Sequence, residues 1–114
     1  MVTIYHNPRC GKSRNSLKLI KEKGVTPEIV EYLKTPLDAA TISGILGLLG
    51  IPARDLLRKG EAVYKELGLK NPDLAEDDLI AAMAQNPILI ERPVIVANGK
   101  AVIGRPPEKV LQIL

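Results

Sequence analysis

The sequence predicts a single α/β domain over residues 1–114, built on a mixed sheet of about four strands. A strand, a helix and a second strand follow one another at the start of the chain. A helical stretch occupies the middle, and a β-hairpin followed by a helix comes last. A strand–helix–strand unit normally gives parallel strands, whereas a hairpin adds antiparallel ones, so the sheet should be mixed.

In the first half of the chain, the pattern of apolar residues changes several times between one typical of strands and one typical of helices. Residues 2–6 and 28–33 are rich in β-branched and aromatic side chains and are predicted to be strands. Residues 13–23 carry apolar side chains among lysines and are predicted to form a helix. A second helix is expected between an N-cap at Asp38 and a stop at Gly50.

The middle of the chain is predicted to be helical. Residues 51–58 should form about one helical turn, and residues 61–67 a short helix. Three consecutive acidic residues from Glu76 onward favour the start of a longer helix, because acidic side chains suit a helix N-terminus. That helix should end before Pro87.

The last part of the chain is predicted to form a hairpin and a helix. Residues 94–97 and 100–103 have strand character, and Asn98-Gly99 between them favours a type I′ turn. A final helix is expected over residues 108–114, with three inward-facing residues: Val110, Leu111 and Leu114. This order of elements is typical of a thioredoxin-like fold with a helical insert.

Composition limits the classes of function. A chain of 114 residues with 46% hydrophobic residues can bury a core. One cysteine cannot form an internal disulfide and suits a reducing cytoplasm. No apolar run is long enough to cross a bilayer, and stacking aromatics and dense basic stripes are missing. We therefore expect a cytoplasmic monomer with no membrane or nucleic-acid partner.

The most informative residue is the single cysteine, Cys10, which lies where the first strand gives way to the first helix. Free N–H groups at a helix start favour an anion, and Arg9, Lys12 and Arg14 add positive charge. Both effects should lower the thiol pKa below the roughly 8.5 of a free cysteine. The alternative is a buried structural cysteine, which polar and cationic neighbours disfavour.

Three familiar motifs resemble this stretch, and each fails on one residue. A phosphate-binding P-loop needs a glycine where His6 stands. A cysteine phosphatase needs an arginine six residues after the nucleophile, where Ser16 stands. A C-x-x-C redox pair needs a second cysteine where Ser13 stands.

Three arginines are candidates for binding an anion: Arg58, Arg92 and Arg105. The planar guanidinium suits a tetrahedral oxyanion, although surface ion pairs are the alternative. Arg92 and Arg105 flank the predicted hairpin, so they should lie at the same end of the sheet. Pro93, after Arg92, is expected to follow a cis peptide bond, as in thioredoxin folds.

Two further polar residues have open roles. His6 could orient the loop, tune the thiol of Cys10, or make a structural hydrogen bond. No second ligand stands at suitable spacing for a metal, so no metal site is predicted. Ser13 is either a helix cap or a hydrogen-bond donor to the thiolate.

These residues together resemble the arsenate reductase family that works with glutathione and glutaredoxin, in particular a chromosomal branch of it. The resemblance covers essentially the whole chain. The matching residues are His6-Asn7-Pro8, Cys10, Ser13-Arg14-Asn15, Leu56-Leu57-Arg58, Pro87-Ile88-Leu89-Ile90, Arg92-Pro93 and Arg105-Pro106.

The resemblance implies a role for each candidate. Cys10 would be the nucleophile that attacks arsenate, and His6 would help to lower its pKa. The oxyanion ligands would be Arg58, Arg92 and Arg105, and the supporting residues would be Asn7, Ser13, Arg14 and Pro93. No bound cofactor is expected. One thiol cannot reduce arsenic alone, so glutathione would serve as thiol co-substrate and glutaredoxin as partner, in arsenic detoxification.

Two other functions remain open at this stage. The protein could be a monothiol, glutathione-linked oxidoreductase that acts on another substrate. It could also be a redox-related transcription regulator that binds RNA polymerase, as in a neighbouring branch of the same superfamily. That branch senses redox state through a C-x-x-C pair, which Ser13 removes here.

Overall fold

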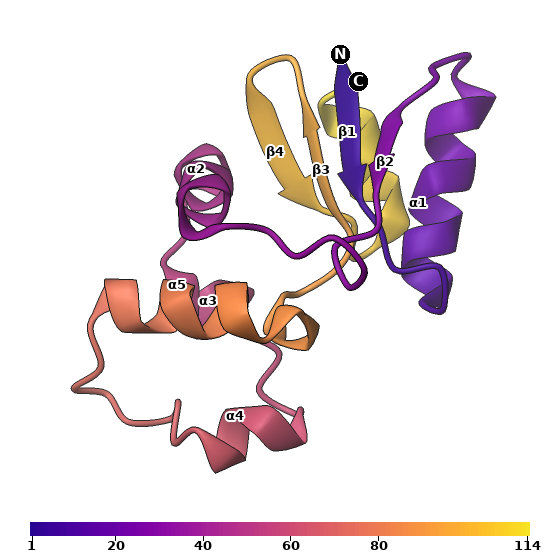
Figure 1. Ribbon diagram of the computed structural model, residues 1–114. Coiled ribbons are helices and arrows are strands. Elements are labelled where there is room, and N and C mark those ends of the chain that lie inside the picture. Colours follow the sequence, from indigo (N-terminus) through magenta and orange to yellow (C-terminus); the bar gives the residue numbers. More distant parts are fainter. The chain divides into compact units, whose positions relative to one another are not determined.

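The computed structural model describes residues 1–114 and divides them into two compact units (Figure 1). The first unit comprises residues 1–35 and 92–114 and holds the sheet; we call it the sheet unit. The second comprises residues 36–91 and is helical; we call it the helical unit. A single functional domain over residues 1–114 stays a prediction.

The sheet has four strands in the order β2-β1-β3-β4. β1 (Val2–Tyr5) pairs in parallel with β2 (Glu28–Val30) and antiparallel with β3 (Val94–Ala97). β3 pairs antiparallel with β4 (Lys100–Ile103). This mixed sheet confirms the predicted thioredoxin-like arrangement of two N-terminal and two C-terminal strands.

One face of the sheet carries the core of the sheet unit. Helix α1 (Gly11–Glu22) and the 3-10 helix η2 (Pro107–Gln112) contact each other there, as Figure 1 shows. The strands alternate, so every second residue of a strand faces this core. Its buried members are Val2, Ile4, Ile20, Ile95, Ala97, Val110 and Ile113.

The second strand is shorter than predicted. β2 ends at Val30, whereas the sequence predicted a strand to Leu33. The carbonyl of Glu31 accepts hydrogen bonds from the N–H groups of Lys34 and Thr35, both at 2.9 Å, so the chain turns away from the sheet. A residue whose carbonyl closes a turn cannot also continue the strand ladder.

The last helix also differs from the prediction, because it is a 3-10 helix and not an α-helix. A 3-10 helix has three residues per turn, so residues three apart share a face. Val110 and Ile113 therefore face the core together, and Leu111, predicted to be buried, is 40% exposed. Val110 is buried in the core as predicted, and Leu114 is partly buried and packs against it, also as predicted.

The hairpin confirms its predicted turn. Asn98 and Gly99 both have positive φ, 54° and 72°, which a type I′ turn requires. The Asn98 side-chain amide donates to the carbonyl of Ile113 at 2.7 Å and joins the turn to η2. The Arg92–Pro93 bond is cis, as predicted, and the Arg105–Pro106 bond is also cis, which was not predicted.

The helical unit contains the four predicted helices and a short 3-10 helix that was not predicted. They are α2 (Ala39–Leu49), α3 (Ala53–Leu56), α4 (Ala62–Glu66), α5 (Glu76–Gln85) and the 3-10 helix η1 (Pro87–Leu89). α5 lies at the centre of the unit and contacts α2, α3 and η1. None of the helices in either unit has the length and apolar character that a membrane span needs.

Hydrogen bonds join the short segments of the helical unit. Asp38 caps α2 as predicted, because its carboxylate accepts from the Thr41 N–H at 2.8 Å. A carboxylate oxygen of Glu76, at the start of α5, accepts from the N–H of Ala53 at 2.8 Å. Arg54 donates to the carbonyl of Leu69 at 2.8 Å and so ties α3 to the segment after α4.

Gly104 stands where the base of the hairpin meets α1, and the fold requires a glycine there. A Cβ at this position would collide with Ser16 Oγ and would lie 2.8 Å from Cγ of Pro93. We predict that Gly104→Ala lowers the free energy of unfolding by roughly 1–3 kcal/mol, the usual cost of overpacking.

Denaturant unfolding checks this prediction, with Gly47→Ala as the matched control. Gly47 lies inside α2 with no atom within 4 Å of the added Cβ, so the same substitution should be neutral or stabilising there. Equal stability of the two variants would show that the packing around Gly104 is not tight.

Candidate functional site

Cys10 is the N-cap residue of α1. Its backbone is extended, with φ −93° and ψ 123°, and the helix begins at the next residue. The N–H of Cys10 donates to the carbonyl of Asn7 at 3.0 Å, and its carbonyl accepts from the N–H of Arg14 at 3.0 Å. The sulfur therefore stands at the helix N-terminus, where unpaired N–H groups favour a negative charge.

Ser13 fastens the loop to the helix. Its hydroxyl is fully buried and lies 2.7 Å from Nδ1 of His6, at the end of β1. The same hydroxyl accepts a hydrogen bond from the N–H of Asn7 at 3.1 Å. Ser13 thus joins the residues that leave the sheet to the first turn of α1, and it holds the loop on which Cys10 sits.

Two further contacts close the outer side of the loop. The Arg14 guanidinium donates to the carbonyl of Pro8 at 3.1 Å. The side-chain carbonyl of Asn7 accepts from the N–H of Arg9 at 3.0 Å. Asn7 and Arg14, predicted as supporting residues, therefore shape the loop around Cys10 and do not contact the sulfur.

Opposing effects act on the pKa of the Cys10 thiol. Partial burial is the largest single effect and raises the pKa, because it disfavours the thiolate. The backbone N–H of Ser13, the charge of Arg92, the backbone N–H of Lys12 and the side chain of Arg105 all lower it. Together these donors and charges prevail, so the thiol pKa lies below its ordinary value.

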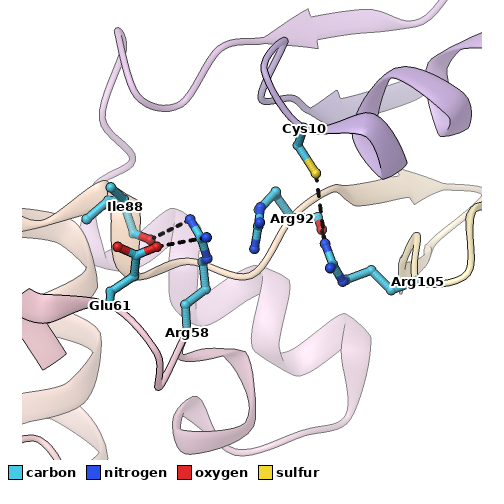
Figure 2. Close-up of polar contacts among 6 residues, drawn as sticks. All are labelled: Cys10, Arg58, Glu61, Ile88, Arg92 and Arg105. Atoms are coloured by element: carbon cyan, nitrogen blue, oxygen red, sulfur yellow. Dashed lines mark hydrogen bonds and ion pairs between the residues drawn. The ribbon is translucent and has the colours of Figure 1, made fainter.

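Arg92 and Arg105 lie at the same end of the sheet, as predicted. Pairing of Val94 with Ile103 brings the two ends of the hairpin together. One guanidinium nitrogen of Arg105, Nη1, donates to the carbonyl of Arg92 at 3.1 Å and lies 3.9 Å from the sulfur of Cys10 (Figure 2). The sheet unit thus brings the Arg105 guanidinium to the thiol of Cys10, and the charge of Arg92 also acts on that thiol.

The positive charge that lowers the pKa of Cys10 does not come from the residues that were predicted to supply it. The side chains of Arg9, Lys12 and Arg14 were expected to lower the thiol pKa, but none of them is among the causes of the shift. All three are exposed, and Arg14 is directed to the Pro8 carbonyl. Solvent screens exposed charges, whereas Arg92 and Arg105 approach the sulfur from the hairpin.

The sequence left alternative roles open for His6 and Ser13, and their contacts in the structure distinguish between these alternatives. His6 makes the structural hydrogen bond to Ser13, and it is not among the groups that shift the pKa of Cys10. Burial lowers the pKa of His6 and so favours its neutral form, although Glu31 opposes this. Ser13 is not the helix cap, and it acts on the thiol through its backbone N–H.

Arg58 belongs to the helical unit. Its guanidinium forms an ion pair with Glu61 at 2.8 Å and donates to the carbonyl of Ile88 at 3.4 Å, as Figure 2 shows. Its backbone N–H donates to the carbonyl of Leu89 at 2.7 Å. These contacts hold the side chain in place, and its assignment as an oxyanion ligand stays a prediction.

Removing the hairpin arginines should raise the pKa of the Cys10 thiol. We predict that Arg92→Gln raises it more than Arg105→Gln, since the Arg92 charge is the larger of the two effects. The rate of alkylation by iodoacetamide against pH measures this, because only the thiolate reacts. Arg9→Gln is the control and should leave the profile unchanged.

Because the pKa of Cys10 is lowered in the folded state, the stability of the fold depends on pH. The pKa of Cys10 in the folded state lies below its ordinary value, so the thiolate stabilises the fold at pH values above the unfolded-state pKa. The contribution disappears as the pH falls through the folded-state pKa.

If the alkylation profile of Cys10 matched that of a free cysteine, the thiol pKa would not be lowered, and the site as described would be wrong.

Comparison with known proteins identifies the family. The model of the ArsC family matches residues 5–113. The chain is 60% identical to the uncharacterized protein YfgD of Escherichia coli K12, over 99% of this chain and 96% of that protein. It is 47% identical to an arsenate reductase of Neisseria meningitidis, over 99% and 97% of the two chains. The solved arsenate reductase from Vibrio cholerae is 46% identical with a TM-score of 0.97, over 99% and 97% of the two chains. The chain therefore belongs to the ArsC family and has its thioredoxin-like fold.

Proposed function

We propose that this protein is an arsenate reductase, with Cys10 as its nucleophile. The observation that carries the proposal is a thiol with lowered pKa at a helix N-terminus, 3.9 Å from the Arg105 guanidinium. A thiolate held beside cationic groups can both attract and attack a tetrahedral oxyanion. The choice of arsenate as the substrate rests on the names of the relatives, which include arsenate reductases.

The first step forms a bond between sulfur and arsenic. The Cys10 thiolate attacks As(V) of arsenate, and one arsenate oxygen leaves as water or hydroxide. No electrons have moved to arsenic at this point. Arg92 and Arg105 are proposed to bind the arsenate oxygens, because guanidinium donors can follow the charge as it redistributes during attack.

Reduction requires two electrons, which one thiol cannot supply. We propose that glutathione binds to the arsenic through its sulfur and expels a second oxygen as water. A glutaredoxin thiolate then attacks that glutathione sulfur, and the electron pair of the sulfur–arsenic bond stays on arsenic as As(III). Two outside thiols have become one disulfide, and hydrolysis then releases arsenite from Cys10.

Several parts of this proposal come from the family resemblance. They are the role of Arg58 as a third oxyanion ligand, the absence of a bound cofactor and the role in arsenic detoxification. The cytoplasmic location and the monomeric state are expectations from the composition of the chain. The proposed role of Arg105 is supported by its contact of 3.9 Å with the sulfur of Cys10. The proposed role of Arg92 is supported by its charge, which lowers the pKa of the thiol.

A coupled assay tests the proposed activity. Arsenate-dependent NADPH oxidation, in the presence of glutathione, glutaredoxin and glutathione reductase, should proceed with the native protein and stop with Cys10→Ser. The serine hydroxyl is nearly the same size as the thiol but far less acidic, so the fold should remain while the nucleophile is lost. Turnover that survives Cys10→Ser would rule out this mechanism.

Substitutions at Arg92 separate charge from geometry in the same assay. Arg92→Gln should raise the KM for arsenate by roughly 10- to 150-fold, if about 1.5–3 kcal/mol of charge-assisted hydrogen bonding is lost. Arg92→Lys should lose less, because it keeps the charge but not the planar fork. An unchanged KM in both variants would remove Arg92 from the binding site.

A folded protein that shows no arsenate turnover would leave one alternative in place. The same lowered thiol pKa and the same cations suit a monothiol oxidoreductase that acts on glutathione mixed disulfides. Activity toward such a disulfide, lost in Cys10→Ser, would select that alternative.

A further inference from the structure

The two units of the chain carry opposite charge. The sheet unit contains eleven Lys and Arg residues and four Glu residues, a net side-chain charge of +7. The helical unit contains five basic and nine acidic residues, a net charge of −4. The overall charge of +3 hides this division, and the positive charge belongs to the unit that holds the thiol.

Part of this charge forms a stripe along α1, which we call the α1 stripe: Arg14, Lys18 and Lys21. Intervals of four and three residues place them on one face of the helix. All three are exposed, and they line an open hollow of about 440 Å³ together with Leu17 and Glu22. No dense basic stripe was expected from the sequence, where these three residues are separated, but on α1 they share one face.

Lys21 lies in the last turn of α1, where the helix dipole favours a positive charge, but the N-terminal part of the α1 stripe does not help the helix to fold. The first turn of α1 has no acidic residue and carries Lys12 and Arg14, against the direction that the helix dipole favours. Arg14 and Lys18 are like charges four residues apart, which repel. The only ion pair that the α1 stripe makes joins Lys18 to Glu22; it is exposed and 4.0 Å long. In contrast, α5 begins with three acidic residues.

The length of the stripe indicates the size of its partner. Cys10 stands at the start of α1, and a helix rises about 1.5 Å per residue, so Lys18 and Lys21 lie about 12 and 16 Å from it along the axis. A fully extended tripeptide spans at most about 10–11 Å, so one bound at the sulfur would stop short of both lysine positions. A protein covers roughly 800 Å² of its partner, which is enough to reach both lysines.

We propose that the α1 stripe is the docking surface for the protein thiol that regenerates Cys10, and that this partner is acidic around its own reactive cysteine. The inference rests on the proposed function, because a chain with one cysteine needs an outside thiol. Leu17 at the hollow offers an apolar contact among the charges. Such charge pairing mainly accelerates association and selects the partner.

The exchange can be studied without arsenate. Cys10 first reacts with glutathione disulfide, giving a Cys10–glutathione disulfide and one free glutathione. The partner thiolate then attacks the glutathione sulfur, the sulfur–sulfur bond breaks, and Cys10 leaves as a thiolate. The partner is oxidised to a mixed disulfide with glutathione as Cys10 is reduced. Failure of arsenate turnover would therefore not affect the test.

The test variant is Lys18→Glu with Lys21→Glu. Its matched control is Lys23→Glu with Lys100→Glu, which changes the net charge by the same amount at exposed positions outside the stripe. Lys100 pairs with Ala97 beside the hairpin turn, at the end of the sheet opposite Arg92. Each glutathionylated protein is reduced by an acidic glutaredoxin and, separately, by 2-mercaptoethanol.

The stripe variant should react about 10-fold more slowly than wild type with glutaredoxin at low salt, the lower end of the effect of electrostatic steering. The difference should shrink in about 0.5 M salt, where the screening length falls to a few ångströms. With 2-mercaptoethanol, wild type and both variants should react alike. The control variant should stay within about twofold of wild type with glutaredoxin.

Three results would overturn the proposal. The first is a stripe variant that reacts with glutaredoxin as the control variant does. The second is an equal decrease in the rate of reduction of the stripe variant by 2-mercaptoethanol, which would show that the substitutions alter the reactivity of the disulfide itself. The third is binding of a 20-base-pair DNA duplex that the stripe variant abolishes, which would assign the surface to nucleic acid.

Discussion

The site depends on keeping a partly buried sulfur negatively charged. Burial is the largest single effect on the pKa of Cys10, and alone it would raise that pKa and leave the thiol protonated and unreactive. The opposing donors come from two distant parts of the sequence: the first turn of α1 and the base of the hairpin, with Arg92 and Arg105. The sheet brings these parts together, since β1 leads into α1 and pairs with β3. The reactivity of the thiol is therefore a property of the fold and not of the loop alone.

Small residues and buried hydroxyls give this arrangement its precision. Ser13 directs its backbone N–H toward the thiol while its side chain is held between His6 and the N–H of Asn7. Gly104 lets the base of the hairpin approach Ser16 of α1 more closely than any other residue would allow. Both residues act through backbone position, and a side chain in the wrong place would move the donors away from the sulfur.

Much of the fold could be predicted from local signals: the four strands, the Asp38 cap, the acidic start of α5 and the Asn98-Gly99 turn. The errors have physical causes. β2 stops early because the Glu31 carbonyl closes a turn, and Leu111 is exposed because the last helix is of the 3-10 type. Cys10, Arg92 and Arg105 were found from residue type and the hairpin. The assignment of the charge effect to the exposed neighbours Arg9, Lys12 and Arg14 was wrong, because sequence proximity does not reveal which cations reach the sulfur.

With one cysteine, the protein can complete a reduction only with thiols from outside the chain. Intact mass spectrometry of the protein incubated with arsenate and glutathione, with glutaredoxin left out, tests that claim most directly. We expect one adduct that contains both arsenic and glutathione, located at Cys10 and absent from Cys10→Ser. An unmodified protein, or an adduct that persists in Cys10→Ser, would contradict it.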